Sequence, residues 1–318
     1  MIPLEKLPEN LVKKLETQYQ EEDRKRILEG YKGNRYVTLR VNTLKKAVDQ
    51  IKAEFNQFNI DYEEVPFYQA AFVIKNKTEK ELEELEMYQK GEIYLQSLSS
   101  MIPPMVLDPK QGEDILDMTA APGGKTTQIA AMVKNNANIT ACEMNAIRME
   151  RLKYNIEKQG ASCVYTMQTD ARNLDNFFSF DRILLDAPCT GSGTIQVGEK
   201  FSKAIFEEEK IRKITIAQKK LLKKALNLLK PGMEMVYSTC SILKEENEEV
   251  LEEILKQGKT EIVPIELTGI EKVPLLPTKI KGTICVCPNS YYEGFFVAKI
   301  RKVAPPNVQI ASQSHRLK

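Results

Sequence analysis

Apolar residues near the start of the chain recur at helical spacing, at Leu7, Leu11 and Leu15, and predict one or two helices over 4–30. After this region the pattern changes to short apolar runs. It predicts a strand over 36–42, a helix over 44–58, short strands over 62–65 and 71–74, and a helix over 78–88 that a capping box opens. We therefore expect residues 1–90 to form a small α+β domain that faces the substrate.

From residue 91 onward, apolar runs typical of buried strands alternate with amphipathic helical segments. Strands are expected over 115–118, 138–142, 164–167, 180–186 and 234–237, with a last, antiparallel strand over 293–300. Helices are expected over 96–106, with a break at Pro103-Pro104, and over 216–229 and 243–256. Strands that alternate with helices predict a parallel sheet. We expect an α/β fold with a Rossmann-like domain over 91–302 and a flexible tail over 303–318.

The run from Asp117 to Thr127 links a buried strand to a helix through a turn that contains Gly123 and Gly124. Such a junction points backbone N–H groups and the positive helix end at an anionic ligand group. A nucleotide-triphosphate loop would need glycine where Thr119 stands, and the Gly-x-Gly-x-x-Gly fingerprint of dinucleotide sites is absent. The turn therefore favours a cofactor that is held by its amino-acid end and its ribose.

Acidic residues follow the next two expected strands, Glu143 after 138–142 and Asp170 after 164–167. A ribose-binding acid stands at about this distance, ~20 residues after the glycine turn, in related folds. Either acid alone would be interpreted as a polar strand end. The ordered series favours S-adenosylmethionine, whose amino-acid moiety, ribose hydroxyls and adenine amino group need successive contacts.

Composition limits the class of protein. The chain has 318 residues, of which 42% are hydrophobic, and this is enough for an α/β domain and a smaller partner. It shows no apolar run of membrane-spanning length and no secretory leader, and its six cysteines have neither disulfide-framework nor zinc spacing. We expect a cytoplasmic protein without a membrane or metal partner.

Basic residues near the start of the chain are a candidate phosphate-binding surface: Arg24, Lys25, Arg26, Arg35 and Arg40. The net charge of +2 does not by itself indicate nucleic-acid binding. A phosphate-binding surface and an ordinary solvated surface are equally open interpretations.

Two cysteines, Cys189 and Cys240, each lie just past the end of an expected core strand. The only histidine is His315, in the tail, and this argues against a cysteine–histidine hydrolase. A thiolate can instead add to carbon 6 of cytosine and make carbon 5 nucleophilic enough to take a methyl group, while a carboxyl such as Asp186 supports the addition at ring nitrogen 3. A lone cysteine would be small apolar filler. Two such loops beside a methyl-donor site favour catalysis, and the residues alone leave open which thiol attacks.

Five segments resemble, in order, the motifs of the Nol/Nop/Sun family of RNA cytosine-5 methyltransferases: Arg40–Lys45, Asp117–Thr126, Asp186–Gly193, Tyr237–Ser241 and Glu293–Phe296. Five motifs in the same order are hard to meet by chance. The resemblance implies a class I methyltransferase domain that uses S-adenosylmethionine. It also implies that Cys240 is the nucleophile and that Cys189 assists release of the methylated product.

The resemblance further implies a set of cofactor-binding residues: Thr119, Ala120, Ala121, Pro122, Gly123, Gly124, Lys125, Glu143, Arg148, Asp170 and Asp186. Thr119 stands where the family often has cysteine, and contacts made by the backbone survive this change. Residues 288–292 stand where the family usually has a histidine. This second departure bears on the substrate subclass and not on the reaction.

We therefore expect an RNA (cytosine-5-)-methyltransferase, acting as a monomer, that forms 5-methylcytosine in structured RNA through a covalent cysteine adduct. The N-terminal layout resembles the bacterial ribosomal RNA members, so rRNA is favoured and tRNA is the second choice. One alternative is a non-catalytic RNA-binding or ribosome-assembly factor that retains the fold; the presence of Cys189, Cys240 and Asp186 argues against it. Another is a methyltransferase for DNA or a small molecule, whose activity would be insensitive to RNase.

Overall fold

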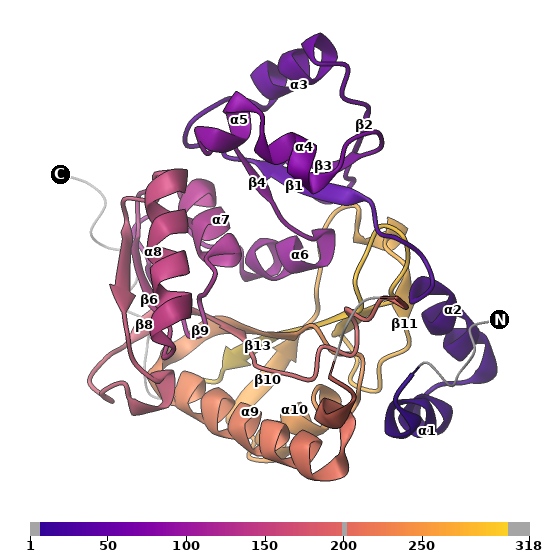
Figure 1. Cartoon of the computed structure of the whole chain (residues 1–318). Helices are drawn as coiled ribbons and strands as arrows, with labels where there is room; N and C mark the ends of the chain where they lie inside the picture. Colours follow the sequence, from indigo (N-terminus) through magenta and orange to yellow (C-terminus); the bar gives the residue numbers. More distant parts are fainter. Residues whose placement is uncertain (1–6, 199–201, 305–318) are drawn as a thin grey trace.

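The computed structural model describes residues 7–198 and 202–304 and places them in two β-sheets with helices around them (Figure 1). The smaller sheet is built from residues early in the chain, and the larger sheet from residues after Asp114. Of the expected tail, only Val303 and Ala304 lie within the described residues, and His315 lies outside them.

The smaller sheet is antiparallel, with the strand order β2-β3-β1-β4. Its elements are β1 Val37–Val41, α3 Val48–Gln57, β2 Tyr62–Glu64, β3 Ala71–Ile74, α4 Glu79–Glu83, α5 Glu86–Gln89 and β4 Ile93–Leu95. Phe55 and Phe72 pack edge to face in its own hydrophobic core. The expected strands are confirmed. The helix expected over 78–88 is instead divided, because the capping box at Thr78 opens only α4 and the chain turns before α5.

The larger sheet has the strand order β11-β12-β13-β9-β8-β5-β6-β7, with β10 paired to β13. Its parallel strands are β5 Asp114–Asp117, β6 Asn138–Cys142, β7 Val164–Met167, β8 Phe180–Asp186 and β9 Leu229–Thr239. The remaining strands are β10 Thr260–Val263, β11 Leu275–Leu276, β12 Ile284–Val286 and β13 Phe295–Lys302. β13 pairs antiparallel with β9. The expected α/β fold and its antiparallel last strand are confirmed.

Helices cover both faces of the larger sheet (Figure 1). One face carries α6 Leu98–Leu107, α7 Gly124–Met132 and α8 Ala146–Gln159, and the other carries α9 Glu208–Leu228 and α10 Glu248–Leu255. Ile115 and Leu184 pack in the core under α6 and α7, whereas Leu116 and Leu185 pack under α9. Both faces of the central strands β5 and β8 are buried, which explains their apolar runs in the sequence, whereas the edge strand β7 is partly exposed.

Helix α6 runs through Pro103 and Pro104, so the expected break in it is wrong. A proline inside a helix leaves the carbonyl four residues earlier without its backbone donor. For Pro104 this carbonyl belongs to Ser100, and Gln96 Nε2 donates to it at 3.2 Å. The side chain therefore satisfies the acceptor that the backbone cannot reach, and the helix continues.

Helices α1 Glu9–Gln18 and α2 Glu21–Gly30 confirm the helical region at the start of the chain. Their apolar residues belong to the core of the larger sheet and not to that of the smaller one. The Tyr19 hydroxyl donates to Ile242 O at 2.5 Å, and the Tyr31 hydroxyl donates to Ser192 O at 2.6 Å. These helices thus support the larger sheet, and the domain division at residue 90 stays a prediction.

The two sheets meet at Arg40 of β1, whose side chain is fully buried. Its Nε donates to Gln96 Oε1 at 2.9 Å, and its Nη2 donates to Thr127 Oγ1 at 2.6 Å and to Gly124 O at 3.1 Å. The guanidinium carbon lies 5.0 Å from the centre of the Tyr94 ring. A buried guanidinium needs such acceptors to offset its lost hydration. Arg40 therefore holds the smaller sheet against the start of α7.

Replacing Arg40 by alanine should lower the free energy of unfolding by about 3 kcal/mol, because it leaves buried acceptors without a donor and opens a cavity. Equilibrium denaturation in urea measures this change. Arg151→Ala removes an exposed arginine of α8 and is the matched control, with an expected change below about 0.5 kcal/mol. Equal stability of the two variants would contradict the role assigned to Arg40.

Candidate active site

The turn between β5 and α7 lies where the order of the parallel strands reverses. β6 and β7 lie on one side of β5, and β8 and β9 lie on the other. Open α/β sheets bind their ligands outside the carboxyl ends of the strands at such a point. Gly123 has φ of +109°, a backbone conformation that favours glycine. Helix α7 begins at Gly124 without a side-chain cap, so its first N–H groups are available to a ligand.

Asp117, at the end of β5, holds this turn in place. Its Oδ2 accepts a hydrogen bond from Thr126 Oγ1 at 2.7 Å, and its Oδ1 accepts one from Thr119 N at 3.4 Å. The side chain is buried, and burial raises the pKa of Asp117 to about 6. One carboxyl thus braces both ends of the turn.

The expected cofactor acids Glu143 and Asp170 lie directly after β6 and β7, at the same edge of the sheet as the turn. Glu143 accepts from Asn145 N at 2.8 Å and lies 3.4 Å from Nη1 of Arg148. Arg148 also donates to Ala121 O at 2.7 Å and so connects Glu143 to the glycine turn. Hydrogen bonds from Arg172 hold the pKa of Asp170 below its ordinary value. The structure therefore brings the predicted cofactor residues together.

Asp186, at the end of β8, joins the glycine turn to β9. Its Oδ2 lies 2.7 Å from Lys125 Nζ, and its Oδ1 accepts from Ser238 Oγ at 2.8 Å. Burial alone would lower the pKa of Lys125, but the Asp186 carboxylate reverses this effect and the pKa is raised. Lys125 is therefore a fixed cation between the cofactor turn and the loop that carries Cys240.

Cys189 and Cys240 face each other, with their Sγ atoms 3.2 Å apart. β8 and β9 are neighbours in the sheet and pair Asp186 with Ser238, so the loops that leave their ends meet. Gly193 N donates to Cys240 O at 3.0 Å and joins the loops directly. Both thiols are partly exposed, whereas the other four cysteines are buried. The structure thus brings the two predicted catalytic thiols into contact at the edge of the sheet that carries the cofactor residues.

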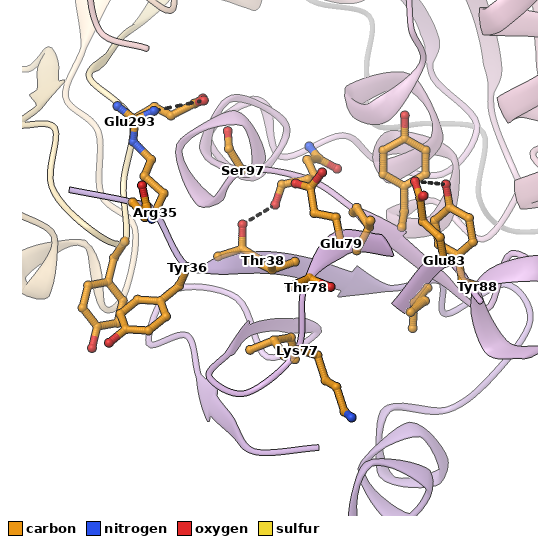
Figure 2. Close-up of a pocket in the computed structure, with 18 of the residues that line it drawn as sticks. Arg35, Tyr36, Thr38, Lys77, Thr78, Glu79, Glu83, Tyr88, Ser97 and Glu293 are labelled. Atoms are coloured by element: carbon orange, nitrogen blue, oxygen red, sulfur yellow. Dashed lines mark hydrogen bonds and ion pairs between the residues drawn. The ribbon is translucent and has the colours of Figure 1, made fainter. Parts of the chain in front are cut away.

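A cleft of about 840 Å³ separates the smaller sheet from the larger one. Pro122 of the glycine turn and Lys158 of α8 lie on one wall, and residues of β1 and β4 line the other. Figure 2 shows Tyr36 near one end of the cleft and Tyr88 near the other. The cleft therefore reaches the candidate cofactor turn from the side of the smaller sheet.

Lysines of the cleft lie over aromatic rings. Lys75 Nζ is 3.8 Å from the ring centre of Tyr36 and 4.3 Å from that of Tyr291, and Lys158 Nζ is 3.7 Å from that of Tyr88. Carboxylates also line the cleft, from Glu79, Glu83 and Glu293. The cleft thus offers ring faces and mixed charge in place of a uniformly basic surface.

The basic residues near the start of the chain do not form one phosphate-binding surface. Arg40 is buried, so this hypothesis is wrong for it. Arg35 donates to the carbonyl oxygens of Thr194 and Ile195 at 3.0 and 3.1 Å. Lys25 and Arg26 pair with acids of their own helix. Most of the cluster supports the fold or sits in local ion pairs.

Sequence reasoning missed three residues that hold the site: Asp117, Ser238 and Glu246. Asp117 and Ser238 lie inside the motifs, Asp117 within an expected strand and Ser238 just after one, and no side-chain role was predicted for either. Glu246 lies within the helix expected over 243–256, but the observed helix α10 begins at Glu248, and Glu246 is fully buried behind the cysteine loops. The only signal in the sequence is its position six residues after Cys240, and this has a meaning only once the structure shows its contacts with Thr190 and Ser241.

No helix in the described ranges is long and apolar enough to cross a membrane. Within residues 7–198 and 202–304, no group of three or more His, Cys, Asp or Glu side chains is arranged to hold a metal ion. The expected absence of membrane and metal partners stays a prediction.

The sequence matches known families along most of its length. Residues 104–301 match the family described as 16S rRNA methyltransferase RsmB/F, and residues 7–80 match a ferredoxin-like domain described as RsmF/B-like. The chain is 36% identical over 276 residues to ribosomal RNA small subunit methyltransferase F of Shewanella loihica, covering 84% of this chain and 56% of that protein. It is 35% identical over 275 residues to tRNA (cytosine(49)-C(5))-methyltransferase of Pyrococcus abyssi, covering 83% and 88%. The chain thus spans little more than half the length of the Shewanella relative.

Solved structures show the same architecture. A methyltransferase homologue from Pyrococcus horikoshii is 31% identical with a TM-score of 0.77, covering 93% of this chain and all of that one. NSun6 from the same organism, with SFG, has a TM-score of 0.82 at 22% identity and covers 95% of this chain, which bears on the fold alone. The expected Rossmann-like methyltransferase domain with a small N-terminal α+β domain is confirmed.

The pKa of Asp117 predicts a pH-dependent stability. It is about 6 in the folded chain against 3.8 as the ordinary value, so protonation favours the folded state. The stabilisation is complete below about pH 4 and is lost as the pH rises through about 6, by about 3 kcal/mol. In urea denaturation, the free energy of unfolding of the wild type should fall by this amount between pH 4 and pH 7, relative to that of Asp117→Asn. Asp175→Asn, which changes an exposed aspartate, should follow the wild type. Parallel profiles for wild type and Asp117→Asn would contradict the prediction.

Proposed function

The chain belongs to the 16S rRNA methyltransferase RsmB/F family, and we propose that it transfers a methyl group from S-adenosylmethionine to carbon 5 of a cytosine in structured RNA. The observation that supports this most directly is the contact between the thiols of Cys189 and Cys240, at 3.2 Å. They lie at the ends of adjacent strands, beside a lysine–carboxylate pair and an uncapped helix start.

The residues around the glycine turn fit the cofactor. The amino-acid end would meet the free N–H groups at the start of α7, and the ribose hydroxyls would meet the Glu143 carboxylate. Asp170 would take the adenine amino group, and Arg148 and Asp186 complete the proposed set, with Thr119–Lys125 forming the turn. When bound, S-adenosylmethionine supplies an electrophilic methyl group.

The thiols would act on the base in turn. Cys240 Sγ forms a bond to carbon 6 of cytosine, and the electron pair of the carbon 5–carbon 6 double bond makes carbon 5 the nucleophile that takes the methyl group. Asp186, held by Lys125 and Ser238, would support the addition by a hydrogen bond to ring nitrogen 3, for which its carboxyl must carry a proton. Loss of the carbon 5 proton then restores the double bond as the carbon–sulfur bond breaks. Cys189 assists this release.

The cleft between the sheets is the proposed path for the RNA. A target base in a helix must leave its stack to reach Cys240. Unpaired nucleotides stack on aromatic side chains, and the rings of Tyr36 and Tyr88 lie along the cleft. Because the cleft carries both lysines and glutamates, we expect recognition of bases to matter there as well as recognition of phosphates.

Among RNA classes, we propose rRNA first and tRNA second. The matched family is described for 16S rRNA, and the Shewanella relative carries an rRNA name. The Pyrococcus abyssi relative carries a tRNA name and is covered more fully, at 88% of its length. A monomeric, cytoplasmic protein stays the expectation.

Cys189→Ala should trap the reaction. With S-adenosylmethionine and total RNA from cells that lack this gene, a covalent protein–RNA adduct should accumulate and survive denaturing electrophoresis, because release is impaired while Cys240 still attacks. The double variant Cys189→Ala/Cys240→Ala should form no adduct. Sequencing of the trapped RNA would identify the substrate.

Other outcomes of the trapping experiment have distinct meanings. An adduct that persists without Cys240 would reverse the assignment of the two thiols. No adduct, together with no methyl transfer by the wild type, would favour the alternative of a non-catalytic RNA-binding or assembly factor. Methyl transfer that resists RNase would favour a DNA or small-molecule substrate.

Tyr36→Ala should weaken binding of a single-stranded oligoribonucleotide by about 1–3 kcal/mol, or roughly 5- to 150-fold in Kd, because a stacking ring is lost. Fluorescence anisotropy measures the two affinities. Phe177→Ala, which removes a 95% exposed ring that does not line the cleft, is the control and should leave Kd unchanged. Equal affinities of Tyr36→Ala and wild type would remove the cleft from the proposal.

A further inference from the structure

A buried carboxylate, Glu246, lies behind the two thiols and has no part in the chemistry proposed above. Thr190 donates to it twice, from N to Oε1 at 2.8 Å and from Oγ1 to Oε2 at 2.7 Å. Ser241 Oγ also donates to Oε2. Thr190 follows Cys189 in the chain, and Ser241 follows Cys240. One carboxylate therefore joins the residues next to both thiols.

The hydrogen bonds among Glu246, Ser241 and Ser192, behind the thiols, have a consistent set of donors and acceptors. Ser241 has one hydroxyl proton and donates it to Glu246, so Ser192 Oγ, 2.8 Å away, is the donor to Ser241. The backbone N–H of Ile242 in turn donates to Ser192 Oγ at 2.9 Å. Burial raises the pKa of Glu246, and the hydrogen bonds from Ser241 and Thr190 oppose this shift. Three accepted hydrogen bonds favour the ionised carboxylate of Glu246 against the effect of burial.

We propose that Glu246 is a positioning residue that fixes the spacing of the two thiol loops and keeps Cys189 as a thiol that faces Cys240. This inference rests on the proposed function, since it concerns how the same two thiols divide their roles. Cys189 then donates its S–H to Cys240 Sγ and stabilises negative charge on that sulfur, both before attack on the base and when the sulfur leaves.

The charged groups near the two sulfurs differ. Cys189 contacts the Cys240 thiol, and its pKa is raised by the hydrogen bond to Cys240, by burial and by the negative charge of Glu246. The backbone N–H of Gly191 opposes this in part. The Lys125 cation interacts instead with Cys240. The surroundings of Cys189 therefore favour its protonated form.

The test is the pH dependence of alkylation by iodoacetamide, read for each cysteine by mass spectrometry of its peptide. Only Cys189 and Cys240 are partly exposed, so the four buried cysteines serve as internal controls. In Glu246→Gln, which keeps the shape and removes the charge, the midpoint for Cys189 should fall by about one pH unit. Asp175→Asn, which removes the charge of an exposed aspartate, is the control and should leave this midpoint unchanged. An unchanged midpoint in a folded Glu246→Gln variant would overturn the inference.

A second measurement keeps the inference testable if Glu246→Gln does not fold. Diamide, a diazene oxidant, accepts two electrons and two protons from a pair of neighbouring thiols and leaves a disulfide. Cys189 and Cys240 should cross-link rapidly in the wild type and several-fold more slowly in Thr190→Val, where one anchor of the spacing is lost. An unchanged rate in that variant would overturn the role of the network in spacing. Neither readout needs RNA or methyl donor, so failure here is distinct from failure of the proposed reaction.

Discussion

The contact between the two sheets depends on one buried cation, the guanidinium of Arg40 in β1. Arg40 extends from the smaller sheet, and its acceptors Gly124 and Thr127 belong to the helix that begins at the cofactor turn. Asn42, two residues later, donates to Gly91 O at 2.9 Å and to Gln159 O at 2.7 Å, at the end of α8. Separation of the sheets would leave a desolvated guanidinium without partners, at a cost of several kcal/mol. Strand β1 therefore fixes the two helices that flank the cofactor turn.

This constraint gives the cleft a rigid wall. Because β1 is tied to α7 and α8 by hydrogen bonds, the ring of Tyr36 at the start of that strand keeps its place relative to the glycine turn. If RNA binds in the cleft as proposed, it would meet surfaces from both sheets that are already positioned, and less binding energy would be spent on ordering them. The same bonds couple the stability of the smaller sheet to the conformation of the turn.

Features that follow from local sequence pattern were predicted well, whereas features that depend on contacts between residues distant in the chain were not. Strands with continuous apolar runs, the glycine turn and the acids at strand ends all follow from local pattern, and the structure has them in the expected order. The uninterrupted course of α6 depends on Gln96, and the burial of Arg40 depends on acceptors more than eighty residues away. Glu246 was missed for the same reason: its partner Thr190 is 56 residues earlier in the chain, so the local pattern does not reveal their contact. Hydrophobic periodicity indicates which face of one helix or strand is buried, but it does not indicate which residues elsewhere in the chain pack against that face.

Two chemically identical thiols in contact can hold different roles only if their surroundings differ, and the sheet supplies that difference. Cys240 follows a strand whose neighbour ends in Asp186, and the lysine that pairs with this acid comes from the cofactor turn. Cys189 lies in the other loop, whose next residue is anchored by a buried carboxylate. The residue types alone leave the order of the two cysteines open. The two thiols therefore stand in different surroundings, with the Lys125–Asp186 ion pair near one and the buried Glu246 carboxylate behind the other, and this difference is what the order implied by the family resemblance requires.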